Sequence, residues 1–130
     1  FANILPLVID LANPSPSIGL NNEERSSFIK RIKTDLVLAL ALIHHLAIHR
    51  NIPFEKIAEF LRSIGNTLII EFIPKEDEKI VLMLRQKKDV YDWYSQENFI
   101  SAFSKYYSIE RSAGIGSSKR ILYLMQPNDL

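Results

Sequence analysis

Continuous apolar runs, rather than alternating ones, dominate the pattern along this chain. Three such runs are typical of strands that are buried on both faces of a sheet: Ile4–Asp10 (ILPLVID), Asp35–Leu42 (DLVLALAL) and Asn66–Pro74 (NTLIIEFIP). For the second run a buried helix is an open alternative, because periodicity alone does not separate the two. Farther along, Tyr107–Ile115 and Arg120–Gln126 flank a turn rich in glycine and serine, which predicts an antiparallel hairpin.

Segments with helix signals lie between these runs. They extend from Asn21 or Asn22 to Ile32, from Pro53 to Ile64, from Lys79 to Lys87, and onward from a capping Ser95. In the second of them, apolar residues recur at helical spacing, and Pro53 stands where its missing N–H costs nothing. Gly65 then supplies a C-cap. The alternation of strands and helices predicts an α/β fold: a mostly parallel sheet with helices on both faces and a C-terminal antiparallel hairpin.

Composition narrows the function classes only slightly. The 130 residues are enough for one domain, and the formal net charge of +1 gives no reason to expect nucleic acid or a membrane surface as partner. The chain has no cysteine, which excludes disulfides and thiolate chemistry and fits a cytoplasmic protein. The longest apolar stretch, Leu36–Leu46, is interrupted by His44 and His45 and is shorter than the roughly 20 residues that span a bilayer.

Taken in order, the segments resemble those of a known family. ILPLVIDLANPSPSIGLNNEER, DLVLALALIHHL, NTLIIEFIPKED and the closing pair YYSIERSAGI and RILYLMQ are similar to the third, fourth, fifth and last two strands of class I S-adenosylmethionine-dependent methyltransferases. Within that group the chain looks most like the nodulation-protein-related branch. The resemblance implies that residues 1–130 are the C-terminal part of one Rossmann-like methyltransferase domain. It also implies methyl transfer from S-adenosylmethionine to a small molecule or a protein.

Two cofactor-binding features of that family are missing from the sequence. No glycine-rich turn precedes Ile4, and Gly114-Ile115-Gly116 stands between two late strands, outside the required strand–turn–helix context. The second strand and its terminal acid are absent as well. The chain also begins with Phe1 rather than Met, so we expect a fragment that is inactive alone. Its first strand, Ile4–Asp10, would then move, pair with another copy in a homo-oligomer, or be disordered.

The resemblance points to cofactor-binding residues at the end of the first apolar run. Asp10 would accept a hydrogen bond from the adenine amino group, with Leu11 beside it. The alternative is a solvated loop carboxylate that caps a turn.

The resemblance places the methyl acceptor after the second apolar run, next to His44 and His45. Either histidine would take a proton from the acceptor as a general base; alternatively, one of them only caps or packs against a helix. His49 follows His45 at helical spacing, but no third ligand is evident, so no metal site is predicted. Family members that methylate amide or base nitrogens often carry an Asn/Asp-Pro-Pro-aromatic motif here. Ala41–His44 takes its place, which argues against DNA adenine methylation.

Glu71 is the remaining candidate for a catalytic residue. It interrupts an apolar strand, and a carboxylate there needs a partner or a wet cleft because a lone buried charge is costly. It would orient the acceptor or a histidine; the alternative is an acid that reaches solvent or pairs with Lys75. Tyr91, Trp93 and Tyr94 would line an acceptor pocket or simply pack onto the core. The short basic run Ser118–Arg120 is predicted to be solvated surface.

Three interpretations remain open on the sequence alone. The first is the incomplete methyltransferase, and the second is a methyltransferase-like module that has lost catalysis and serves binding or assembly. The third is an unrelated small α/β domain, such as a nucleotide-binding regulator. A strand with a glycine-rich turn upstream in the gene would support the first interpretation, and its absence would favour the second.

Overall fold

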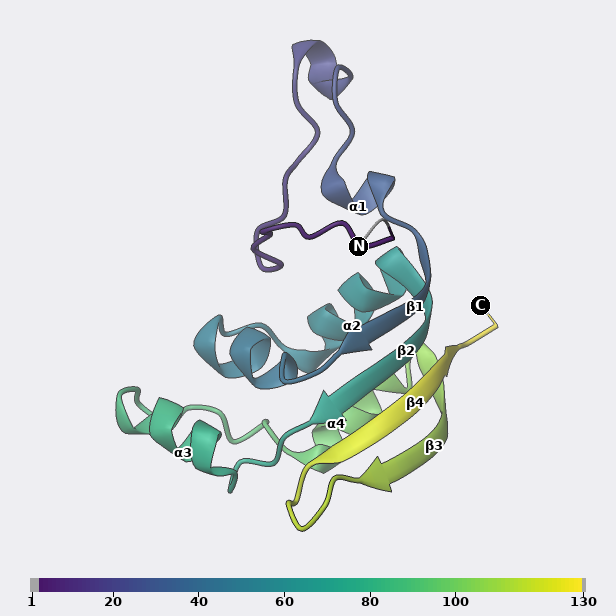
Figure 1. Ribbon diagram of the computed structural model, residues 1–130. Helices are drawn as coiled ribbons and strands as arrows, with labels where there is room; N and C mark the ends of the chain where they lie inside the picture. The colour runs from purple at the N-terminus through teal and green to yellow at the C-terminus, as the bar shows by residue number, and fades with distance from the viewer. Residues whose placement is uncertain (1–2, 130) are drawn as a thin grey trace. The chain divides into compact units, whose positions relative to one another are not determined.

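The computed structural model describes residues 3–129, which belong to two compact units, Phe1–Lys33 and Thr34–Leu130 (Figure 1). No helix within residues 3–129 has the length and apolar character needed to cross a membrane. The second unit contains β1 (Thr34–Ala39), η2 (His45–His49), α2 (Phe54–Ile64), β2 (Gly65–Phe72), α3 (Glu78–Arg85), α4 (Gln96–Phe103), β3 (Tyr107–Gly114) and β4 (Ile121–Pro127).

A four-stranded mixed sheet in the order β1-β2-β4-β3 forms the centre of the second unit (Figure 1). β1 and β2 are parallel, whereas β4 runs antiparallel to both β2 and β3. The C-terminal hairpin and the parallel pair β1–β2 are confirmed, but two of the three strand pairings are antiparallel, so the sheet of this unit is mixed. Residues 115–120 reverse the chain after β3, and β4 returns between β2 and β3.

The core lies between the sheet and two helices, α2 and α4. Phe54 of α2 and Phe99 of α4 both meet Phe72 of β2, at ring-centroid distances of 6.4 and 4.9 Å. Trp93, in the connection before α4, packs edge-on against Phe54 at 5.1 Å. These rings hold α2 and α4 as one layer over one face of the sheet. The apolar stripe of residues 53–64 predicted the buried side of α2 in this layer.

The opposite face of this sheet is not covered in the same way. Leu36 and Leu38 of β1 are 47% and 61% exposed, while Leu68 and Ile70 of the paired strand β2 are 0% and 1% exposed. Side chains alternate between the two faces along a strand, so the buried residues lie under the helices and the leucines lie on the other side. The prediction of helices on both faces therefore fails within the second unit.

Local signals in the sequence predicted α2, α3 and α4 but not η2. The Asp77 carboxylate caps α3 by accepting from the N–H of Lys79 at 3.0 Å, and the Ser95 hydroxyl caps α4 by accepting from the N–H of Asn98 at 3.2 Å. Gly65 ends α2 and begins β2 at once. A side chain at Gly65 would overlap that of Val37, so the close approach of β1 and β2 requires glycine there.

The first unit departs most from the sequence-based expectations. Residues 4–10 form no strand, although the run is as apolar as those that became β1 and β2, and Ile4 and Leu5 are 65% and 79% exposed. The helix expected up to Ile32 is also wrong: the segment contains a short 3-10 turn, η1 (Leu20–Asn22), and the four-residue α1 (Phe28–Arg31). Asn21 and Asn22 adopt left-handed φ angles of 57° and 58°, which interrupts a right-handed helix.

Candidate functional site

Polar side chains meet where the parallel strands β1 and β2 end. After β1 the backbone turns sharply at Ala41, whose φ of +50° is unusual for a residue with a side chain. The chain then enters η2, a single π-helical turn closed by the bond from the N–H of Arg50 to the carbonyl of His45 at 3.0 Å. Such turns are frequent at functional sites.

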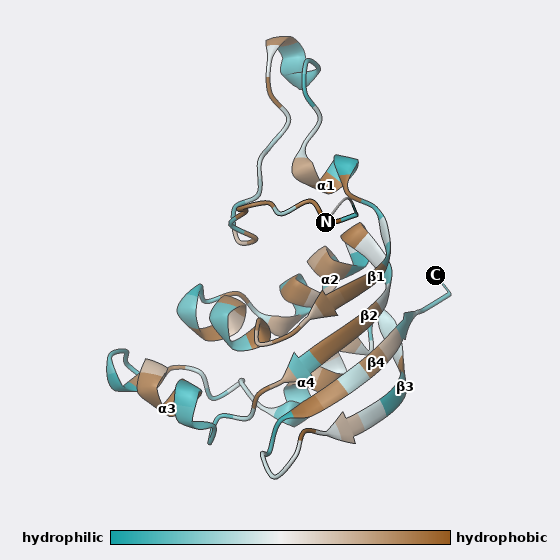
Figure 2. Cartoon of the chain, in the orientation of Figure 1, coloured by the Kyte–Doolittle hydropathy of each residue, from teal (hydrophilic) through white to brown (hydrophobic). Residues whose placement is uncertain are grey.

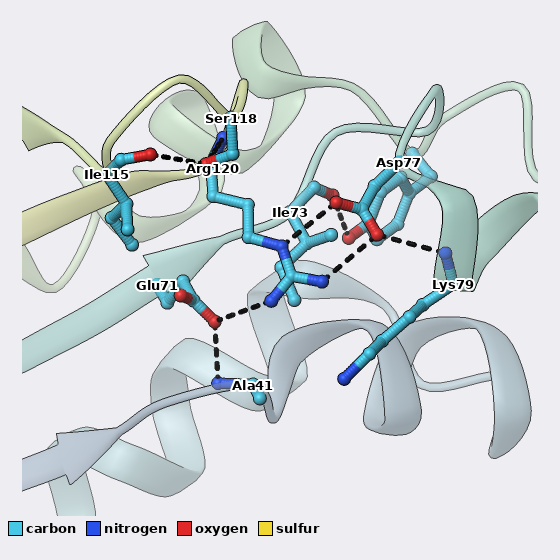
Figure 3. A network of polar contacts seen from close by, with 9 residues as sticks. Ala41, Glu71, Ile73, Asp77, Lys79, Ile115, Ser118 and Arg120 are labelled. Carbon is cyan, nitrogen blue, oxygen red and sulfur yellow. Dashed lines mark hydrogen bonds and ion pairs between the residues drawn. The ribbon is translucent and has the colours of Figure 1, made fainter.

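The Glu71 carboxylate ties the two strand ends together. Its Oε1 atom accepts from the N–H of Ala41 at 2.9 Å and lies 3.9 Å from Nη1 of Arg120 (Figure 3). Glu71 is 8% exposed, so its charge is compensated by a guanidinium and an amide dipole rather than by bulk solvent. Glu71 therefore has a structural role at this edge, whatever else it contributes.

Arg120 is the centre of this polar network. Its Nε and Nη2 atoms donate to the two carboxylate oxygens of Asp77 at 2.9 and 3.1 Å, a bidentate pair (Figure 3). The hydrogen bond from Arg120 lowers the pKa of the Asp77 carboxyl, and the same bond raises the pKa of Arg120. Because Asp77 also caps α3, the network joins β2, α3 and the start of β4.

His44 is buried at the same edge. The side chain is 1% exposed, and its Nδ1 atom has no hydrogen-bond partner within residues 3–129. Burial, followed by the nearby charges of His45, Arg120 and Lys79, lowers the pKa of His44 to about 4. The imidazole is therefore neutral near pH 7, where it offers a lone pair to a donor but is a weak base. His45 is exposed, and its ring centroid lies 4.1 Å from that of His44.

The two predicted cofactor-binding residues belong to the first unit. Asp10 is exposed, and its Oδ1 atom accepts from the N–H of Ala12 at 3.0 Å, while its carbonyl accepts from Asn13 at 3.0 Å. This is the geometry of a carboxylate that caps a turn. Leu11 is half-buried beside it. Their role toward a cofactor stays a prediction.

Sequence reasoning missed one member of the network and offered one pairing that does not form. Arg120 is not solvated surface, as the basic run Ser118–Arg120 suggested, because its side chain is 20% exposed and bonded to Asp77. Lys75 does not pair with Glu71; its Nζ lies 3.0 Å from Asp89 instead. The lone carboxylate in an apolar strand did signal the need for a partner or a wet cleft, but nothing local identified Arg120 as that partner.

The aromatic cluster in the connection before α4 packs onto the core. Tyr91 and Tyr94 are 3% and 2% exposed. The Tyr94 hydroxyl donates to the carbonyl of Ile73 at 2.6 Å, and the Tyr91 hydroxyl donates to the side chain of Asn51. Half-buried Trp93 lines a hollow of about 450 Å³ next to the start of α2. The packing interpretation holds for the two tyrosines, and Tyr91 and Trp93 both border this hollow as well.

One curated protein is similar over nearly the whole chain. Nodulation protein NoeA from Rhizobium meliloti (strain 1021) is 41% identical over 127 residues, which cover 98% of this chain and 27% of NoeA. The chain thus spans about a quarter of the length of this relative. No family model matches the chain, and no solved structure matches it. The similarity supports the nodulation-related part of the resemblance.

Within residues 3–129 no three His, Cys, Asp or Glu side chains gather as a metal site would need.

Proposed function

We propose that this chain is the C-terminal part of an S-adenosylmethionine-dependent methyltransferase domain, which transfers a methyl group to a small-molecule or protein acceptor in a longer protein. The observation that carries the proposal is the strand order β1-β2-β4-β3, with the last strand inserted beside β2. The resemblance implies the same order for the family's fourth strand, its fifth strand and its last two strands, because those two form a hairpin in reverse sequence order at the sheet edge. The similarity to NoeA, a nodulation protein, agrees with the branch of the family that the sequence resembles.

The position of the polar network is compatible with an acceptor site. Ligands of open α/β sheets bind beyond the carboxyl ends of the strands, and His44 and Glu71 lie at that end of β1 and β2. In the proposed reaction Glu71, which is paired with Arg120, holds the backbone of Ala41 in place. The neutral imidazole of His44 accepts a hydrogen bond from the acceptor group and so orients it for in-line attack.

The residues of this chain fit only one end of the cofactor. Asp10 offers a carboxylate for an adenine amino group, but neither the ribose nor the methionine part has a matching acid or glycine-rich turn in the sequence. The cofactor, when bound, supplies an electrophilic methyl group on a sulfonium. Because the 130 residues do not complete its site, no step through the cofactor is assigned to them.

Calorimetric titration of S-adenosylhomocysteine tests this proposal. We expect binding to full-length NoeA, used as the longer relative, and to this chain extended upstream to its natural start, but not to the 130 residues alone. Binding to neither longer protein would overturn the methyltransferase assignment. Binding to the 130 residues alone would contradict a cofactor site that lies mostly outside them.

A non-catalytic binding or assembly module is the second candidate. It is favoured by the polar network itself, since Arg120 satisfies both Glu71 and Asp77, and His44 is nearly inaccessible. Such a network can serve stability alone. Full-length NoeA that binds no S-adenosylhomocysteine, and whose upstream sequence has no glycine-rich turn, would support this module over the enzyme.

A further inference from the structure

The hollow of about 450 Å³ beside the start of α2 has aromatic walls. Trp93 borders it together with Phe54 and Tyr91, whose ring centroids lie 5.1 and 6.0 Å from that of the indole. Phe54 and Tyr91 are buried, whereas Trp93 is half-buried, so part of the indole is open to a ligand. A concave, mostly apolar space with a few polar groups is the usual form of a small-molecule site.

Three polar side chains from three separate segments border the same hollow: Asn51 before α2, Glu55 in the first turn of α2, and Asn98 in the first turn of α4. The two amides are fixed by neighbouring residues. Asn51 accepts from the Tyr91 hydroxyl through its Oδ1 atom, and Asn98 donates from its Nδ2 atom to the carbonyl of Trp93 at 2.9 Å. Within residues 3–129 these bonds leave one amide donor, on Asn51, and one amide acceptor, on Asn98, for a ligand. Figure 2 shows the polar start of α4 close to the more hydrophobic α2.

The charges around the hollow favour an uncharged ligand. The Oε2 atom of Glu55 lies 2.9 Å from Nζ of Lys105, so this carboxylate is already paired, while its Oε1 atom offers a second acceptor. An anionic ligand would meet the Glu55 carboxylate. A cationic ligand would compete with the ammonium of Lys87, which lies 5.3 Å from the centroid of the Tyr91 ring.

A ligand for this hollow needs an apolar face for the rings and polar groups around its edge for the three side chains. Hydroxyl groups both donate and accept, so a ring that carries several of them can meet one donor and two acceptors on different sides. A heteroaromatic base instead has a fixed pattern of donors and acceptors in one plane. A pyranose ring combines C–H groups on its faces with hydroxyls around its edge, and therefore matches the hollow better.

We propose that this hollow binds a neutral sugar ring, whose C–H face packs on the indole of Trp93 and whose hydroxyls bond to Asn51, Glu55 and Asn98. None of the residues that line the hollow belongs to the network around Arg120. The inference is therefore independent of methyl transfer. Sugar binding and cofactor binding can fail separately, because titration of S-adenosylhomocysteine does not probe the hollow.

The experiment titrates methyl glycosides of glucose, galactose, mannose, xylose and N-acetylglucosamine into this chain, followed by proton–nitrogen correlation NMR. At least one glycoside should cause saturable shifts of the Trp93 indole N–H and of the amides of residues 51–55 and 96–98. Glu55→Ala should weaken that binding roughly fivefold or more, because it removes a charged acceptor. The matched variant Glu59→Ala, at an exposed position one turn farther along α2, should bind like wild type. Circular dichroism checks that both variants are folded.

Tetramethylammonium serves as the competing probe, because aromatic walls beside a carboxylate can also hold a quaternary ammonium. Saturable shifts with this cation and with none of the glycosides would overturn the proposal in favour of a cation site. It is overturned equally if no glycoside gives saturable shifts, if Glu55→Ala binds as tightly as wild type, or if the shifted amides lie outside the hollow.

Discussion

The Oε1 atom of Glu71 lies 2.9 Å from the backbone nitrogen of Ala41, a residue 30 positions earlier in the chain. This bond locks the end of β2 to the turn that follows β1, at the edge where the proposed acceptor site lies. Weakening this bond should therefore lower the free energy of unfolding and change the backbone conformation of that turn.

Substitutions of Glu71 measure the bond directly. Glu71→Ala removes an acceptor from Ala41 and one of the two carboxylates from Arg120, and should lower the free energy of unfolding by about 1–3 kcal/mol. Glu71→Gln retains a carbonyl oxygen for Ala41 and should lose less. Urea unfolding checks the order; a glutamine variant that is no more stable than the alanine variant would contradict the role of the Ala41 bond.

Replacing Arg120 with lysine should destabilise the protein. Arg120→Lys keeps the positive charge but loses the fork that donates to both oxygens of Asp77, so we expect a loss of about 1–2 kcal/mol. Arg111→Lys, at an exposed position of β3, is the matched control and should change stability by less than about 0.5 kcal/mol. Equal effects of the two substitutions in urea unfolding would argue against the bidentate pair.

His44 should make stability depend on pH in a defined window. Its folded-state pKa is about 4 and the ordinary value is 6.5, so between these values the unfolded chain binds a proton that the folded chain does not. Stability should therefore fall as the pH drops from about 6.5 to about 4, by at most roughly 3 kcal/mol. His44→Gln should flatten this slope in urea unfolding series.

His49→Gln, at an exposed position, is the control for that series and should keep the wild-type slope. An unchanged slope in His44→Gln would rule out a buried neutral imidazole.

Asp77 affects stability in a lower pH range than His44 does. Arg120 lowers the folded-state pKa of Asp77, so the stability that this carboxylate contributes is present above the unfolded value of about 3.9. That stability is lost as the pH falls below this value.

The left-handed backbone at Ala41 predicts an unusual response to glycine. Ala41→Gly relieves the clash of a Cβ at a φ of +50°, so thermal or urea unfolding should show unchanged stability or a gain of up to about 1 kcal/mol. The same change at Ala39, which is 1% exposed in β1, should instead destabilise, since it removes a buried methyl from a strand. A clear loss in Ala41→Gly would contradict the strained turn.

The sequence predicted those parts of the fold that local patterns determine. The runs that became β1 and β2 were recognised because apolar residues are continuous in them, and α4 because Ser95 caps it. Ile4–Asp10 carries the same pattern yet forms no strand, because pairing with a neighbour, and not composition, makes a strand. The helix expected before Ile32 failed at Asn21 and Asn22, where two asparagines took turn conformations in place of a cap.

The candidate site was only half predictable for a related reason. Glu71 and His44 stood out as polar residues in apolar surroundings, which is a signal that one segment carries alone. Their surroundings include Arg120 and Asp77, which are separated from each other by 43 positions and come together only through the insertion of β4 beside β2. Likewise, the lowered pKa of His44 depends first on burial, which no spacing in the sequence reveals.

The edge-on contact between Trp93 and Phe54 gives this protein its own optical reporter. The chain has one tryptophan, and it lies half-buried where the connection before α4 meets the start of α2. Unfolding would carry that indole from an aromatic contact into water and shift its emission to longer wavelength. Urea unfolding of the wild type and of each variant can therefore be followed by intrinsic fluorescence with no label, and the signal comes from the helix layer, away from the uncovered leucines.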